Sequence, residues 1–366
     1  MIKIFQLVFN LIGAKIGNMK KIKIAQIGIG HDHAGVIFNA LNKLTDIFEV
    51  VGYAEVPEDD LPFDSVKSHK INTAKYYENS KKYTVEELFS MPLDAVVIET
   101  YDLNIVKYAK MAVEKGLHIH IDKAPGENYQ DFEELLSLIK QKNLAFSIGY
   151  MYRFNPLIKE VFSRVKDGDF GEIHTIDAEM SCYHNKQKRE WLSNFKGGMM
   201  QFLGCHLIDL VVRLKGVPNE IISCNYSTGC DGVISKDGGL AVFKYDNCTA
   251  TIKSNMADHG GFLRRHFIVN GKDATMEIRP LEKSGATNSE MSSSMTEYRL
   301  EDGWSGAGKT TKSQNFDRYD DMLIEFSKIV RGEHGYLVDL EMEARVQRCL
   351  VKANGLESDF KGEINL

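Results

Sequence analysis

A glycine-containing turn near the N-terminus has the spacing of a phosphate-binding loop. Gly28 and Gly30 end the apolar run that begins at Ile22, and glycine lets the backbone approach a pyrophosphate without a Cβ in the way. Free N–H groups at the start of the following helix would provide the anion site. The third position of the fingerprint, normally Gly or Ala, is His33. The turn alone is therefore a weak indicator of dinucleotide binding, and an ordinary strand-to-helix turn is the alternative.

Glu55 strengthens the dinucleotide interpretation. It ends a second apolar run, Phe48 to Ala54, a little over 20 residues beyond the glycines, where a Rossmann unit places its ribose-binding acid. A carboxylate there accepts hydrogen bonds from the ribose diol and repels a 2′-phosphate. The spacing therefore predicts NAD rather than NADP.

The run His31-Asp32-His33 contains residue types that bind first-row metals. Neighbouring side chains in a tight turn point in different directions, and the cofactor phosphates need the same place. We therefore expect no metal site here, and no other His, Cys or Asp cluster has convincing ligand spacing. His31 and His33 are predicted to face the cofactor, and a surface histidine is the alternative for His33.

Lys123 follows a short apolar strand, His118 to Ile121, at the sheet edge where open α/β sheets bind ligands. An ammonium beside a nicotinamide can bind a substrate hydroxyl and stabilise the alkoxide that develops as hydride leaves. A solvated surface lysine is the alternative.

These residues require a parallel sheet to position them. Strand-like and helix-like segments alternate over residues 20–149, which predicts a Rossmann domain. The remaining expected strands are Ala95–Ile98 and Ala145–Tyr150, and the expected helices are Ala34–Leu44, Ile105–Lys115 and Tyr129–Lys142.

After Tyr150 strand-like runs follow one another, which predicts an α+β domain over residues 150–366 with an open, mostly antiparallel sheet. Ser284 to Thr311 is rich in Ser, Gly and Thr and is expected to form a long loop or an irregular excursion. Two closing helices, Tyr319–Arg331 and Leu340–Leu356, are expected to pack back. The expected strands are Ile173–Ser181, Glu220–Tyr226, Leu240–Tyr245, Thr249–Asn255 and Arg265–Asn270.

Five motifs resemble the Gfo/Idh/MocA family, named for glucose-fructose oxidoreductase and inositol dehydrogenase. The resemblance spans nearly the whole chain and implies an oxidoreductase with a Rossmann domain and an open antiparallel sheet. It also implies assembly into dimers or tetramers through that sheet, and a sugar or cyclitol substrate. The motifs are Asp94-Ala-Val-Val-Ile98, Asp122-Lys-Ala-Pro-Gly126, Gly149-Tyr-Met-Tyr-Arg-Phe-Asn-Pro156, Trp191 ahead of Gly197-Gly198, and Gly204-Cys-His-Leu-Ile-Asp209.

The resemblance also assigns roles. Lys123 matches the family's catalytic lysine, and His206 matches the general base that takes the hydroxyl proton, work suited to a group with an ordinary pKa near 6.5. Loop residues after the fourth and fifth strands are implied as cofactor contacts. They are Thr100, Asn104, Asp122 and Pro125, together with Lys123.

The sequence departs from the family pattern at several points. Phe202 stands where the family commonly has an aspartate, four residues before the histidine, so His206 is expected to lack its orienting carboxylate. The loop Glu99 to Asn104 differs from the common Ala-Thr-Pro-Asn-x-x-His, and Ala124 interrupts the usual Glu-Lys-Pro.

Polar and aromatic residues at the domain junction are candidates for substrate binding, since these types hydrogen-bond to and stack on sugars. A polar loop with one buried aromatic is the alternative. The candidates are Tyr152, Arg153, Asn155, His184, Asn185 and Trp191, with Asp209 either lining the site or supporting packing.

Composition excludes several other classes. The chain has 366 residues, 43% of them hydrophobic, and a formal net charge of -6, which disfavours a nucleic acid partner. No apolar run reaches the roughly 18 residues of a membrane span. A cytoplasmic protein is expected. Residues 1–19 are interpreted as an extension, either a disordered tail, an artefact or a weak export signal.

The leading hypothesis is hydride transfer between NAD and a hydroxyl or ketone of a sugar, sugar derivative or cyclitol. His206 would accept the proton and Lys123 would bind the oxygen. One alternative is glycosidase or lyase chemistry through transient oxidation with bound NAD. Another is a non-catalytic dinucleotide-binding sensor.

Overall fold

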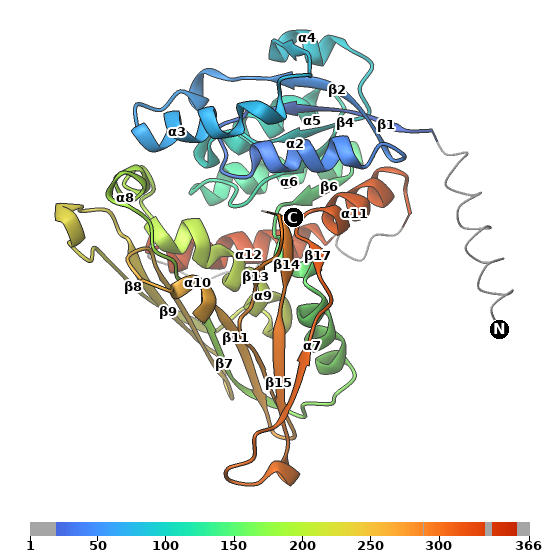
Figure 1. Ribbon diagram of the computed structural model, residues 1–366. Helices are drawn as coiled ribbons and strands as arrows, with labels where there is room; N and C mark the ends of the chain where they lie inside the picture. The colour runs from blue at the N-terminus through green and yellow to red at the C-terminus, as the bar shows by residue number, and fades with distance from the viewer. Residues whose placement is uncertain (1–19, 288, 334–338, 357–366) are drawn as a thin grey trace, which may run out of the picture.

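The computed structural model describes residues 20–287, 289–333 and 339–356, so the interpretation of residues 1–19 as an extension concerns a segment outside the described residues. Figure 1 shows a helix-covered parallel sheet at the top and a larger curved sheet below it, with α9 and α12 between them. Buried apolar residues of both parts form one continuous core. The two sheets are therefore packed into a single body.

The first sheet has six parallel strands in the order β3-β2-β1-β4-β5-β6. The chain leaves β1 in one direction and returns to its other side at β4, so the carboxyl ends of these strands flank a topological switch point. The predicted Rossmann architecture is confirmed. Its strands are β1 Ile22–Ile27, β2 Phe48–Ala54, β3 Lys82–Tyr83, β4 Ala95–Ile98, β5 His118–Ile121 and β6 Phe146–Ile148.

Helices cover this sheet because their buried positions recur at helical spacing. In α5, for example, Ile105, Ala109 and Ala112 are fully buried. Between β2 and β3 the chain forms a crossover that includes α3, which contacts α8 of the second part. The helices are α2 Ala34–Lys43, η1 Pro57–Asp59, α3 Asp64–Thr73, η2 Ala74–Tyr76, α4 Val85–Ser90, η3 Asp102–Asn104, α5 Ile105–Glu114 and α6 Tyr129–Lys142.

The second sheet has eight strands in the order β16-β15-β12-β11-β7-β10-β9-β8. It is mostly antiparallel, with β7 and β10 running parallel, and this confirms the predicted α+β part. The strands are β7 Ile173–Glu179, β8 Glu220–Tyr226, β9 Gly238–Lys244, β10 Thr249–Asn255, β11 His266–Gly271, β12 Thr275–Ile278, β15 Ser294–Tyr298 and β16 Lys309–Lys312. β13 Lys283–Ser284, β14 Glu290–Ser292 and β17 Phe316–Asp317 form a small third sheet.

The expected loop over Ser284 to Thr311 is wrong. β15 and β16 extend the large sheet there, and Met291 and Met295 are buried between more exposed neighbours. This period-two burial is typical of strands, but the Ser, Gly and Thr content of the segment hides it. Among the described residues, no helix is both long and apolar enough to span a membrane.

The junction between the sheets is helical. α12 contacts α6, α9 and β8 and thereby links both parts. The helices of this part are η4 Met151–Phe154, α7 Pro156–Lys166, α8 Lys186–Leu192, η5 Met200–Gly204, α9 Cys205–Lys215, η6 Cys230–Gly232, α10 Gly261–Arg264, η7 Leu300–Asp302, α11 Asp320–Val330 and α12 Leu340–Ala353.

Candidate active site at the carboxyl ends of the parallel strands

The glycine turn after β1 is tightly packed against its neighbours. Gly28 has a φ of +87°, and a Cβ there would lie 2.5 Å from the backbone nitrogen of Thr100. A Cβ on Gly30 would lie 2.4 Å from a carboxylate oxygen of Asp59. Both positions therefore favour glycine. The space next to Gly30, where a phosphate would lie in a dinucleotide-binding turn, contains the Asp59 carboxylate.

Asp59 occupies the anion position of this turn. Its Oδ2 accepts the backbone N–H of Ile29 at 2.8 Å, and its Oδ1 accepts the hydroxyl of Thr100 at 2.8 Å. The side chain is buried. Burial raises the pKa of this carboxyl, although those two hydrogen bonds oppose the shift. Thr100, predicted to contact the cofactor, is thus bonded to Asp59.

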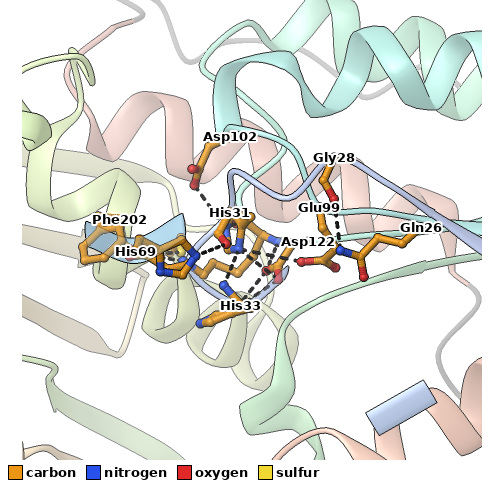
Figure 2. A network of polar contacts seen from close by, with 12 residues as sticks. Gln26, Gly28, His31, His33, His69, Glu99, Asp102, Asp122 and Phe202 are labelled. Carbon is orange, nitrogen blue, oxygen red and sulfur yellow. Dashed lines mark hydrogen bonds and ion pairs between the residues drawn. The ribbon is translucent and has the colours of Figure 1, made fainter. Parts of the chain in front are cut away.

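Two histidines of the turn converge on Asp122, which follows β5 (Figure 2). His31 Nδ1 and His33 Nδ1 lie 3.1 Å and 3.0 Å from the same oxygen, Asp122 Oδ2. Asp32 points away and forms an ion pair with Lys188 at 2.7 Å. The expected divergence of side chains therefore holds for Asp32 and is wrong for the histidine pair.

More carboxylates surround this cluster. Glu99, directly after β4, has Oε2 3.9 Å from His31 Nδ1, and Asp102 has Oδ1 3.5 Å from His31 Nε2. Burial opposes charge on His31, but Asp122 and Asp102 outweigh it and hold the pKa of the ring well above its ordinary value. Burial and the neighbouring Asp122 raise the pKa of Glu99 well above its usual range. The cluster therefore holds at least one proton between its carboxylates.

Lys123 is fully buried next to this cluster, which rules out the solvated-lysine alternative. Its Nζ donates to the carbonyl of Phe202 at 3.1 Å and lies 4.9 Å from the centre of the Phe202 ring. Burial favours the neutral amine, but Cys205 and the carboxylates of Asp102 and Asp122 raise the pKa of the ammonium. Lys123 is therefore a cation at neutral pH.

His206 lies in the first turn of α9, with its ring edge-on to Tyr152 at 5.0 Å between centroids. It is 1% exposed, and neither ring nitrogen has a hydrogen-bond partner within the described part of the chain. Burial, followed by the charge of Lys123, lowers the pKa of His206 well below its ordinary value. The ring is therefore neutral, and its acceptor nitrogen is free.

Phe202 explains why His206 is unpaired. It lies in a π-helical turn, Met200–Gly204, that leads into α9, and such turns recur at functional sites. Its ring contributes no carboxylate and packs on Trp191 at 5.3 Å. Trp191, predicted to bind substrate, is buried in an aromatic cluster with Tyr101 and Phe195. Its ring is thus covered by the protein's own side chains.

The structure corrects the prediction that Arg153 and Asp209 bind substrate. Arg153 donates to Asp209 Oδ2 at 2.9 Å and to both oxygens of Glu343 at 2.7 Å. All three side chains are buried, so the guanidinium is already saturated. Sequence patterns missed this because Glu343 lies 190 residues from Arg153. Asn155 is likewise structural, since its side chain caps α7.

The remaining substrate candidates separate into two places. Tyr152 donates its hydroxyl to the buried Glu282 but keeps its ring against His206. His184 and Asn185 line a polar cavity of about 570 Å³ between α3 and α8. The cavity is lined by Asp32, Asp64, Ser65, Ser68, His69, Asn72, Tyr183, His184, Asn185, Gln187 and Lys188. Lys188 Nζ also lies 5.2 Å from the centre of the Phe202 ring. Because Lys123 contacts the same ring, the cavity lies beside the Lys123 site.

Three predicted cofactor contacts lie in the loops that follow β2, β4 and β5. Glu55 follows β2, and its Oε1 is 2.7 Å from Lys82 Nζ. Asn104 ends η3 and begins α5 without capping it through its side chain. The Pro125 carbonyl accepts a hydrogen bond from Gln347 of α12 at 3.5 Å, which ties its loop to the C-terminal helix.

These observations test whether a dinucleotide fits. The switch point, the close approach at Gly28 and the acid after β2 all fit. The anion position does not fit as it stands, because Asp59 accepts the Ile29 N–H and the His31 N–H is bonded to the Glu99 carbonyl at 2.9 Å. A pyrophosphate can occupy the turn only after the Asp59 carboxylate leaves it.

Sequence reasoning missed Asp59, Glu99 and Asp102 as site residues. Glu99 could have been predicted from the sequence. It directly follows a strand whose four residues are all apolar, at the edge where parallel sheets bind ligands. Asp59 could not have been predicted in this way, because it lies in a polar run that is typical of an ordinary loop.

Comparisons with known proteins agree with this architecture. The profile of the GFO/IDH/MocA C-terminal domain matches residues 158–277. An uncharacterized oxidoreductase of Schizosaccharomyces pombe is 25% identical over 207 residues, which cover 56% of this chain and 54% of that protein. A second, from Escherichia coli, is 24% identical and covers 37% of this chain and 40% of its own. The chain thus spans about half, or less, of the length of these relatives.

Solved structures resemble the whole described fold. A putative NADPH-dependent oxidoreductase from Desulfitobacterium hafniense superposes with a TM-score of 0.73 at 16% identity, covering 92% of this chain and 95% of that one. KijD10, a 3-ketoreductase from Actinomadura kijaniata in complex with NADP and TDP-benzene, gives 0.73 at 17% identity, covering 91% and 97%. At these identities the likeness establishes the fold.

The fold and the site define a two-part α/β protein in which a Rossmann sheet meets a mostly antiparallel sheet, with a lysine and a histidine at the junction. The profile match and the relatives make the class more specific. Residues 158–277 match the C-terminal domain of the GFO/IDH/MocA family, and the resemblance drawn from the motifs is confirmed.

Proposed function

We propose that this protein is an NAD(P)-dependent oxidoreductase acting on a CH–OH group or ketone of a sugar, sugar derivative or cyclitol. One observation carries the proposal: a buried ammonium lies at the domain junction near a buried imidazole whose two nitrogens have no hydrogen-bond partner among the described residues. Leaving such groups buried and unpaired costs free energy. A retained cost of this kind is expected where the groups act on a substrate.

The two groups have complementary tasks. Lys123 donates from Nζ and stabilises negative charge that develops on the substrate oxygen. His206 is neutral, so its free nitrogen can accept the hydroxyl proton during oxidation and return it during reduction. A bound nicotinamide would supply the hydride acceptor or donor. Because burial excludes water, both electrostatic effects are strengthened.

The substrate class is inferred from the polar cavity and from the relatives. A cavity of about 570 Å³ rimmed by hydroxyl, amide and imidazole groups suits a polyhydroxy ligand. Among the solved structures of this fold are the 3-ketoreductase above and a UDP-N-acetylglucosamine 3-dehydrogenase from Acidithiobacillus ferrooxidans. We propose NAD rather than NADP, because Glu55 follows β2.

The test is a substrate panel with purified protein and either NAD or NADP. Sugars, glycosides, sugar acids and inositols are offered, and absorbance at 340 nm is followed together with product analysis. Stoichiometric NADH with one substrate class supports the proposal. Product without released NADH would instead indicate lyase or glycosidase chemistry with a bound cofactor. Binding without any product would favour the sensor alternative.

We further propose a homodimer or homotetramer formed through the outer face of the large sheet. Ile222, Tyr226 and Leu240 are 48%, 43% and 38% exposed and share one face of the β8–β9 pair. Light scattering of the eluting protein should give a multiple of the 41.4 kDa chain mass. An Ile222→Lys change should shift it toward the monomer, and a monomeric wild type would contradict the proposal.

A further inference from the structure

We propose that His31, His33 and Asp122 bind a divalent first-row transition-metal ion, with Glu99 as an adjoining carboxylate ligand. The site lies at the carboxyl ends of β1, β4 and β5, one residue before Lys123. It does not depend on the proposed function, because neither a dinucleotide nor a substrate is needed to form it.

The separations between donor atoms match those around such an ion. The Nδ1 atoms of His31 and His33 lie 3.1 Å and 3.0 Å from Asp122 Oδ2. One ligand atom from each residue lies within 4.8 Å of the other two. With metal bonds of about 2.1 Å, ligands at a right angle are about 3.0 Å apart. Two of the three donor separations therefore already equal the edge length of a coordination polyhedron.

The hydrogen bonds orient these donors inward. His31 Nε2 lies 2.9 Å from the Lys123 carbonyl, which can only accept, so Nε2 carries a proton. Nδ1 is then the nitrogen that faces Asp122, and it also accepts the backbone N–H of His33 at 3.2 Å. The backbone N–H of Lys123 donates to Asp122 Oδ1 at 2.6 Å, which leaves Oδ2 toward the histidines. Metal-binding histidines and carboxylates are typically fixed by such outer contacts.

Glu99 provides an independent indication of a missing cation. It is fully buried, and neither of its oxygens has a hydrogen-bond partner among the residues that the structure describes. Its Oε2 lies 3.9 Å from His31 Nδ1, and Figure 2 shows its carboxyl group beside that of Asp122. Buried carboxylates are normally paired or coordinate metals. An ion among the three residues would give Glu99 a partner.

The donor set selects the class of ion. Two imidazoles with carboxylates favour zinc, iron, cobalt or nickel, whereas magnesium and calcium prefer all-oxygen sites. The competing arrangement contains only protons, shared among the rings and carboxyls, and it would bind no ion tightly.

The experiment uses the full chain, stripped with chelator and titrated with Co²⁺ without cofactor. Visible d–d absorption reports imidazole coordination, and elemental analysis after Zn²⁺ loading gives the stoichiometry. We expect one ion per chain. His33→Gln and Asp122→Asn should each weaken binding by about 100-fold or more, since even outer-contact losses cost 10- to 100-fold. His174→Gln, at an exposed histidine of β7, should bind like wild type.

Two results would overturn the proposal. In the first, stripped wild-type protein shows no saturable Co²⁺ or Zn²⁺ binding. In the second, His33→Gln binds as tightly as His174→Gln. The wild-type titration decides the question even if Asp122→Asn does not fold, and the partly exposed His33 makes its variant the milder of the two.

Discussion

The glycine turn and the lysine–histidine junction adjoin each other through the contact between His31 and the Lys123 carbonyl, but they differ in how their polar groups are satisfied. At the turn, Asp59 accepts the backbone N–H of Ile29, and His31 and His33 both lie against the Asp122 carboxylate. At the junction, Lys123 Nζ donates one hydrogen bond within the described chain, to the Phe202 carbonyl, and neither ring nitrogen of His206 has a hydrogen-bond partner there. A protein carboxylate thus occupies the position where an anion would bind. The imidazole that would exchange a proton has no hydrogen-bond partner among the described residues.

This difference separates binding from chemistry. A filled anion position opposes cofactor entry until a carboxylate moves, whereas an open imidazole favours substrate binding directly. Variants at the junction should therefore change turnover, and variants at the turn should change affinity.

The largest expected effect is at Lys123. Lys123→Met removes the charge that stabilises the substrate oxygen while keeping the volume, so kcat should fall by about 10² to 10⁴-fold on the substrate identified by the panel. Steady-state kinetics with the exposed Lys115→Met variant as control measures this. Unchanged kcat in the Lys123 variant would contradict a catalytic junction.

The next effect is on stability. The buried Arg153 pairs with Asp209, one turn after His206, and with Glu343 of α12. Arg153→Ala leaves the buried carboxylates of Asp209 and Glu343 with the partly exposed Arg213 as their remaining ion-pair partner. It should lower the free energy of unfolding by about 3 kcal/mol, the low end of the range for a broken buried pair. Arg345→Ala breaks only an exposed pair on the same helix and should change it by less than about 1 kcal/mol. Urea unfolding compares the two.

The same ion pair has a defined pH dependence. Burial raises the pKa of Glu343, but Arg153 and Arg213 outweigh it and lower the pKa below its usual range. A lowered folded-state pKa stabilises the protein above the unfolded pKa of about 4.5. That stabilisation is lost as the pH falls further. The urea midpoint should therefore drop in acid, and much less so in Arg153→Ala.

These contacts show how far the sequence alone could lead. Apolar periodicity located the Rossmann strands and β10 closely, since burial of alternate or continuous apolar positions is encoded locally. Lys123 and His206 were found because each lies in a local motif. Asp59, Glu343 and the convergence of His31 and His33 on Asp122 could not be found, because each depends on where a distant loop or helix returns.

A smaller effect concerns the pH profile of the junction. Burial and Lys123 lower the pKa of His206 below 6.5, and the base must be neutral to accept a proton. The acid limb of kcat/KM should therefore lie below pH 6.5. Phe202→Asp supplies the missing carboxylate and should move that limb upward by about one unit, since a nearby opposite charge favours the protonated ring. If the acid limb of kcat/KM lies at the same pH in Phe202→Asp as in the wild type, the assignment of His206 as the base would be contradicted.

At the turn, Asp59→Ala should strengthen cofactor binding. The change removes the carboxylate that occupies the Ile29 N–H and would repel a pyrophosphate, so the Kd for NAD should fall about tenfold, equivalent to about 1.4 kcal/mol. Asp60→Ala, at the exposed neighbouring carboxylate, is the matched control. Protein fluorescence during NAD titration measures both. If Asp59→Ala binds NAD less tightly than Asp60→Ala, Asp59 supports the cofactor site rather than occupying it.

The smallest effect should arise at the far end of the same site. Glu55 forms an ion pair with Lys82 at 2.7 Å, so one carboxylate both repels a 2′-phosphate and holds the ammonium that could bind one. Glu55→Gln removes the repulsion and frees Lys82, and it should shift the ratio of NADP to NAD affinity upward by a few-fold, since exposed pairs contribute up to about 1 kcal/mol. Lys82→Gln should move the ratio the opposite way. Titrations with NAD and NADP at low salt measure both affinity ratios. Equal ratios in the two variants would show that the Glu55 carboxylate does not contact the ribose. The preference for NAD would then have no physical basis.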